Sequence, residues 1–248
     1  MELTETKQQK QFLKESSCFS ETDPEFSELF QNFAFDAVID QGNLDNHTRM
    51  MAIISTLLGC QGIEEFTAML PVAEQSGVTP VELKEIVYQA VAYLGWGRVR
   101  PFLSALNQYF EKQGISLPLE GQSTTTPETR LQAGIQTQVD IFGDGMKEFY
   151  KSDPEESRHI NYWLASNCFG DYYTRKGLDY AQRELITFCF LSAQGGCEPQ
   201  LISHAAANMK VGNDKEFLIQ VVSQCLPYIG YPRSLNALRC INQAAEQA

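Results

Sequence analysis

Cys197 and His204 are the residues whose types and spacing point most directly to chemistry. They lie seven residues apart in "ITFCFLSAQGGCEPQLISHAAANM", Ile186 to Met209. The paired glycines before Cys197 and Pro199 after it predict a loop that enters a helix, because proline suits a first helical turn. The segment is therefore a candidate thiol site or a candidate histidine acid–base site.

Helix geometry separates these two side chains. Cys197 is expected at the positive end of the helix, where the partial charges favour a thiolate and lower the pKa of the thiol. His204 is expected ~10 Å farther along the helix axis, since each residue rises 1.5 Å. The two side chains can thus cooperate only through water, a substrate or another helix.

The composition excludes several classes of protein. The 248 residues carry a formal net charge of −12, which argues against binding nucleic acid or an anionic membrane. The N-terminal residues are polar, and no apolar run approaches the ~20 residues of a membrane-spanning helix, so a cytoplasmic protein is expected. Seven scattered cysteines without a Cys-x-x-Cys pair do not form a disulfide framework or a typical zinc site. No metal or cofactor is predicted.

The chain contains one pattern twice. "GNLDNHTRMMAIISTLLG" from Gly42 matches "KGLDYAQRELITFCFLSA" from Lys176 at an offset of 134 residues. "IVYQAVAYLGWGRVRPFLSALNQ" matches "VVSQCLPYIGYPRSLNALRCINQ" at an offset of 135 residues. Two ordered matches at nearly one offset indicate duplicated domains.

Both copies are predicted to be helical, which makes the expected fold class all-α, with two tandem helical bundles. The apolar runs lack the alternation of strands. In "TPVELKEIVYQAVAYLG", Thr79 and Glu82 predict a capping box and Gly95 predicts the helix end. The expected boundaries are an N-terminal tail at 1–22, a first domain at 23–115, a linker at 116–135 and a second domain at 136–248.

The second copy resembles the carboxymuconolactone decarboxylase family, which is related to the alkylhydroperoxidase D-like proteins. The resemblance rests on the Leu-Asp…Arg-Glu opening, the Gly-Gly loop, Gln-Leu-x-x-His and Tyr-x-Gly-Tyr-Pro. It implies a helical bundle that assembles into a homo-oligomeric ring, here a trimer of tandem chains, acting on a small-molecule substrate. It also implies one of two chemistries, decarboxylation of a carboxylated lactone or thiol-dependent reduction of peroxides.

The residues fit the decarboxylase pattern better than the thiol pattern. Cys197 falls on the first cysteine of the thiol motif, but Gln200 stands where the second is required. The decarboxylase pattern needs the two glycines, Gln200, Leu201 and His204, all of which are present at the expected spacing. Cys197 is optional in that pattern.

Roles follow for the candidate site residues. His204 is the expected acid–base, Glu184 can hold its tautomer, and Arg183 can anchor a substrate carboxylate. Gln200 is a further candidate for substrate binding. The first copy has Met50 and Leu70 in place of Glu184 and His204, so it is expected to be a structural partner.

Three functions remain open at this point. The leading one is a lyase-type reaction on a small carboxylated lactone or keto acid in the breakdown of aromatic compounds. The alternatives are a single-cysteine, peroxiredoxin-like peroxidase that uses Cys197, and a catalytically degenerate assembly protein.

Overall fold

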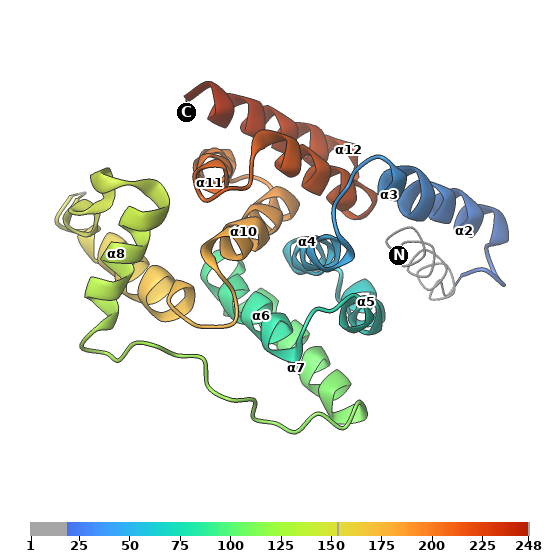
Figure 1. Ribbon diagram of the computed structural model, residues 1–248, viewed down its shortest axis with the longest axis horizontal. Coiled ribbons are helices and arrows are strands. Elements are labelled where there is room, and N and C mark those ends of the chain that lie inside the picture. The colour runs from blue at the N-terminus through green and yellow to red at the C-terminus, as the bar shows by residue number, and fades with distance from the viewer. Residues whose placement is uncertain (1–18, 153, 248) are drawn as a thin grey trace.

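The computed structural model describes residues 19–152 and 154–247, and all regular structure in that part of the chain is helical (Figure 1). This confirms the predicted all-α class. The first repeat comprises α2 (Pro24–Gln31), η1 (Asn32–Ala37), α3 (Val38–Asp40), α4 (Asn46–Gly59), α5 (Ile63–Gln75), α6 (Pro80–Leu94) and α7 (Trp96–Lys112). The second comprises α8 (Arg130–Phe142), η2 (Asp144–Met146), η3 (Phe149–Lys151), α9 (Arg158–Trp163), η4 (Leu164–Tyr173), α10 (Tyr180–Gln194), α11 (Glu198–Lys210) and α12 (Lys215–Gln247).

The two repeats share their order of helices. Each has a π-helical segment, η1 or η4, ahead of a buried helix, α4 or α10. Helix α12 consists of two helices, because the backbone at Gly230 has φ of 74° and is not helical. Gly95 separates α6 from α7 with φ of 81°. A left-handed glycine thus ends the corresponding helix in both repeats, and in the second it follows Pro227, which lies inside the helix.

Side-chain caps fix where these helices begin. Asp45 accepts a hydrogen bond from the backbone N–H of Thr48, and Asp179 accepts one from Gln182. Thr79 and Glu82 form the predicted capping box at α6. These caps satisfy N–H groups that have no partner within the helix.

The repeats pack into each other. Figure 1 shows α4 and α10 side by side at the centre, and α4 also contacts α12 while α10 contacts α6. Gly59 of α4 lies so close to α10 that an added Cβ would sit 2.7 Å from Cβ of Ala193. Ile186 and Phe190 of the second repeat belong to the core of the first. Each repeat therefore completes the interior of the other.

The connecting segments differ in part from the predicted boundaries. Helix α8 begins at Arg130, inside the segment 116–135 that was predicted to be a linker. The extended chain before it runs along one edge of the molecule in Figure 1. The predicted tail at 1–22 lies mostly outside the described residues, and α2 begins at Pro24. In the described ranges, no helix is both long and apolar enough to span a membrane.

Candidate active site

His204 and Glu184 form a buried pair between two neighbouring helices. Nδ1 of His204, on α11, lies 2.7 Å from Oε2 of Glu184, on α10. The exposed fractions of the two residues are 8% and 0%. Gly195 and Gly196, with φ of 70° and 72°, make the turn that folds α11 back onto α10. The structure thus brings together the two residues that the sequence assigned to acid–base chemistry.

The pairing determines which nitrogen of the imidazole is available. A carboxylate next to Nδ1 favours the tautomer or imidazolium in which Nδ1 donates a proton to it. Among the described residues, Nε2 of His204 has no hydrogen-bond partner. Nε2 is therefore the atom that can accept or deliver a proton, while Glu184 fixes the orientation of the ring.

Two tyrosines extend this pair, and the sequence analysis missed both. The hydroxyl of Tyr173 donates to Oε1 of Glu184 at 3.0 Å, and it lies 2.8 Å from the hydroxyls of Tyr93 and Thr187. Burial is the main cause that raises the pKa of both tyrosines well above the ordinary value, so both phenols stay protonated at neutral pH. They can donate hydrogen bonds but carry no negative charge.

Aromatic rings enclose the imidazole. Tyr93 and Phe142 meet the ring of His204 edge to face, with centroids 5.5 Å and 5.4 Å away. The thiol of Cys168 lies 3.9 Å from the hydroxyl of Tyr93, and burial raises its pKa to about 12. Tyr93 comes from the first repeat, so the site is built from both copies. The sequence feature that could have drawn attention to Tyr93 is the tyrosine at the equivalent position of the second repeat, Tyr228.

Asn208 fastens the two helices of the pair together. Its amide donates to the backbone carbonyls of Glu184 and His204, at 2.9 Å and 2.8 Å. It also accepts a hydrogen bond from the side chain of Asn213. These contacts fix the position of α11 along α10, which keeps the imidazole of His204 facing the carboxylate of Glu184.

Arg183 does not have the free guanidinium that the expected role as a substrate anchor requires. The side chain is fully buried and donates to Glu85 at 3.1 Å, to Gln89 at 2.7 Å and to the carbonyl of Arg175 at 2.7 Å. Arg175 also binds both carboxylate oxygens of Glu85. We refer to Glu85, Gln89, Arg175 and Arg183 as the Glu85 cluster. Within it, Arg183 has a structural role.

Gln200 lies one helical turn before His204, on the exposed side of the first turn of α11. Its side chain makes no hydrogen bond to the rest of the described chain. It remains a candidate substrate contact on position alone.

Cys197 lies where the sequence predicted, but the pKa of its thiol is shifted in the opposite direction. It is the N-cap residue of α11, its thiol donates to the carbonyl of Leu191 at 3.5 Å, and the amide of Gln194 lies 3.7 Å from Sγ. Burial raises the pKa of this thiol, and the negative charge of Glu198 adds to the rise, against a lowering by Gln194. Desolvation thus outweighs the hydrogen bond from Gln194, and the pKa shifts upward instead of downward as expected.

We expect Cys197 to be alkylated by iodoacetamide at neutral pH more slowly than a free cysteine. Because the pKa is raised, the thiolate fraction is small there, and the midpoint of the rate profile should lie above the ~8.5 of a free thiol. Mass spectrometry of the Cys197 peptide, with glutathione as the reference, measures this. A plateau reached well below that value would show an activated thiolate and contradict the structure.

The first repeat has no counterpart of the His204–Glu184 pair. Met50 and Leu70, at the positions of Glu184 and His204, are both fully buried in its apolar core. Because aliphatic side chains replace the ionisable ones, the described residues contain this acid–base pair in the second repeat alone.

A surface hollow lies beside His204. It has a volume of about 400 Å³ and is lined by Ile141, Phe142, Ser203, Ala206, Ala207, Met209 and Lys210. Phe142 is both part of this wall and in contact with the imidazole, so it connects the hollow with His204. No group of three or more His, Cys, Asp or Glu side chains that could hold a metal ion occurs in the described ranges.

Comparison with known protein families gives a match that covers both repeats. A family model described as the carboxymuconolactone decarboxylase family matches residues 24–108 and 160–243. The matched ranges fall on the two repeats and include Tyr93, Glu184 and His204, whereas Phe142 lies between them. The chain has no match among curated proteins.

Proposed function

Because the chain belongs to the carboxymuconolactone decarboxylase family, we propose that His204 and Glu184 catalyse a lyase-type reaction on a small carboxylated lactone or keto acid. The observation that carries the proposal is the buried contact of 2.7 Å between Nδ1 of His204 and the carboxylate of Glu184. It leaves one ring nitrogen for proton transfer in an enclosed site.

The proposed chemistry uses the pair as a proton source. The bond between the substrate carbon and its carboxylate breaks, carbon dioxide leaves, and the electron pair passes into the lactone or keto carbonyl as an enolate. The protonated Nε2 of His204 then delivers its proton to the carbon, and solvent restores it. Glu184 stabilises the imidazolium before this transfer, and the phenol of Tyr173 holds the second oxygen of Glu184.

The hollow beside Phe142 is the proposed entrance for the substrate. Lys210 on its rim supplies a positive charge for a substrate carboxylate, in place of the buried Arg183. A substrate that approaches His204 from this side must displace the ring of Phe142, which shields the imidazole from water when the site is empty.

The two alternatives have less support. A peroxidase that uses Cys197 needs a ready thiolate, and burial raises the pKa of this thiol. A degenerate assembly protein has no need to keep a buried histidine–carboxylate contact, whereas the second repeat retains the contact of His204 with Glu184 and the hydrogen bonds that support it.

The test is release of carbon dioxide from a panel of carboxylated γ-lactones and keto acids. The wild-type and Cys197→Ser proteins should both turn over at least one member, with product identified by chromatography. Absence of turnover across the panel, together with peroxide consumption that disappears in Cys197→Ser, would replace the proposal by the thiol chemistry.

We also propose that the chain forms a homo-oligomer, a trimer of tandem chains. Trp96 and Tyr231 occupy equivalent positions after the two left-handed glycines, and they are 55% and 62% exposed. Two equivalent exposed aromatic residues per chain suit an interface that repeats around a ring. Light scattering should give about three times the chain mass of 27.9 kDa, and Tyr231→Glu should lower it. A wild-type monomer at micromolar concentration contradicts the proposal.

A further inference from the structure

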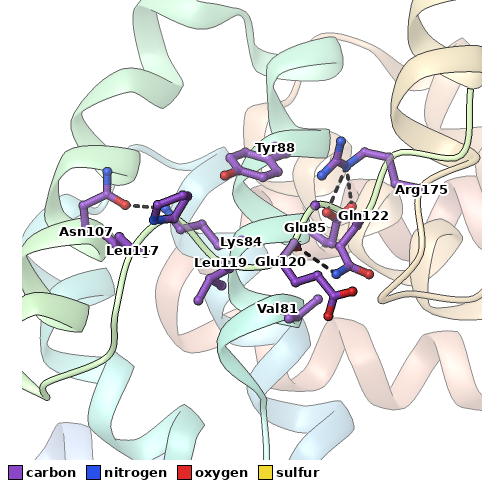
Figure 2. Close-up of a pocket in the computed structure, with 12 residues that line it drawn as sticks. Val81, Lys84, Glu85, Tyr88, Asn107, Leu117, Leu119, Glu120, Gln122 and Arg175 are labelled. Atoms are coloured by element: carbon purple, nitrogen blue, oxygen red, sulfur yellow. Dashed lines mark hydrogen bonds and ion pairs between the residues drawn. The ribbon is translucent and has the colours of Figure 1, made fainter. Parts of the chain in front are cut away.

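A pocket separate from the His204 site lies where the extended chain crosses α6 and α7 (Figure 2). It has a volume of about 340 Å³, within the range of small-molecule sites. Its walls include side chains of α6, Asn107 of α7, Arg175, and the segment 117–122. Figure 2 shows Lys84 and Asn107 meeting at one side of the pocket and Glu85 and Arg175 at the other, with Tyr88 between them.

Lys84 is a buried cation without an anionic partner among the described residues. The residue is 7% exposed, and its ammonium donates to the side-chain oxygen of Asn107. The rings of Tyr88 and Phe110 lie 5.8 Å and 5.7 Å from Nζ. An ammonium has three donors and is costly to bury unless it is paired, so one amide oxygen and two ring faces leave it incompletely satisfied.

The other charges around the pocket do not supply that partner. Glu85 is held by Arg175 at 2.9 Å and by Arg183 at 3.1 Å, so its charge is already matched by two guanidinium groups. Glu120 is the other carboxylate in the lining and is exposed to solvent. The guanidinium of Arg175 also lies over the ring of Tyr88, at 5.3 Å. The lining thus carries two positive and two negative side chains, and Lys84 is the positive one that no carboxylate of the described residues neutralises.

The remaining walls are apolar and fixed. Val81, Leu117 and Leu119 are half-buried side chains in the lining. Beyond them the extended chain is tied down, because Gln122 accepts a hydrogen bond from the backbone of Lys176 and Thr124 donates one to the carbonyl of Thr174.

We propose that this pocket binds a small organic carboxylate, with its anionic group on Lys84 and its apolar body between Tyr88 and the segment 117–122. The site is independent of the reaction proposed for His204. The ligand completes the hydrogen bonding of the buried ammonium, while the leucines and Tyr88 remove its hydrocarbon part from water.

The test uses benzoate as the probe and benzamide, its neutral analogue, as the reference, both titrated calorimetrically into the full-length protein. Benzoate should bind at least about tenfold more tightly, because a hydrogen bond to a charged group is worth that much or more. Lys84→Met should weaken benzoate binding at least about tenfold. Lys112→Met, which removes an exposed lysine of α7, should leave the affinity unchanged.

A second variant keeps the test decisive if Lys84→Met does not fold. Leu119→Trp fills the pocket from the extended chain without altering Lys84, and it should abolish benzoate binding. His204→Asn should bind benzoate as the wild type does. Absence of saturable binding to the wild type, or binding that survives Leu119→Trp but is lost in His204→Asn, overturns the proposal.

Discussion

Replacement of His204 by asparagine is expected to lower kcat/KM for carbon dioxide release about 10²–10⁴-fold, the usual contribution of a positioned acid–base group. Asparagine retains a polar amide toward Glu184 but cannot transfer a proton through Nε2. The exposed fraction of His204 is only 8%, so water has poor access to take over the transfer. Steady-state kinetics on the best substrate of the panel measures the effect, with thermal unfolding to verify that the variant is folded.

The matched control is His159→Asn. His159 is exposed and packs on Trp163, with ring centroids 4.8 Å apart, so its replacement should leave turnover unchanged. Glu184→Gln should reduce turnover as well, since the amide loses the charge that stabilises the imidazolium. A folded His204→Asn protein with wild-type turnover would rule out the proposed role of the pair.

Replacement of Glu85 by glutamine should lower the free energy of unfolding by about 3–5 kcal/mol, the cost of removing one partner from a buried ion pair. Glu85 is 1% exposed and Arg183 is fully buried. Without the carboxylate, the Arg183 guanidinium stays buried with its charge unmatched. Urea unfolding followed by circular dichroism measures the change.

Two further variants locate this effect in the Glu85 cluster. Glu111→Gln removes a carboxylate from the exposed face of α7 and should change stability by no more than about 0.5 kcal/mol. The double variant Glu85→Gln, Arg183→Met should lower the free energy of unfolding by less than the sum of the two single variants. In the double variant both charges of the pair are removed, so no unmatched charge remains buried. Strict additivity of the two changes would mean that the pair is not coupled in the folded protein.

The parts of the structure that the sequence predicted correctly depend on short-range signals. The capping box at Thr79 and Glu82 and the helix end at Gly95 each involve residues a few positions apart. The contact of Glu184 with His204 could be predicted because the two residues lie on adjacent helices joined by a tight Gly-Gly turn. Local patterns of this kind constrain the backbone whatever the rest of the chain does.

The parts that were missed or wrong depend on partners far away in the chain. Arg183 was assigned to a substrate because Glu85, its actual partner, is 98 residues earlier and belongs to the other repeat. Tyr93 is 80 residues from Tyr173, so no spacing linked it to the site. For Cys197, the position before a helix predicted a lowered pKa, whereas the burial that raises the pKa depends on packing that the sequence does not show.

The interlocked packing of the two repeats also bears on how the chain is made. Synthesis from the N-terminus completes α4 and α6 before α10 and α12 exist. The faces of α4 and α6 that pack on α10 in the finished protein are therefore exposed to solvent while the rest of the chain is synthesised. Newly made first repeat thus exposes apolar surface and Tyr93 for as long as translation of the rest takes. The site assembles only at the end, when α11 emerges and places His204 against a tyrosine made more than a hundred residues earlier.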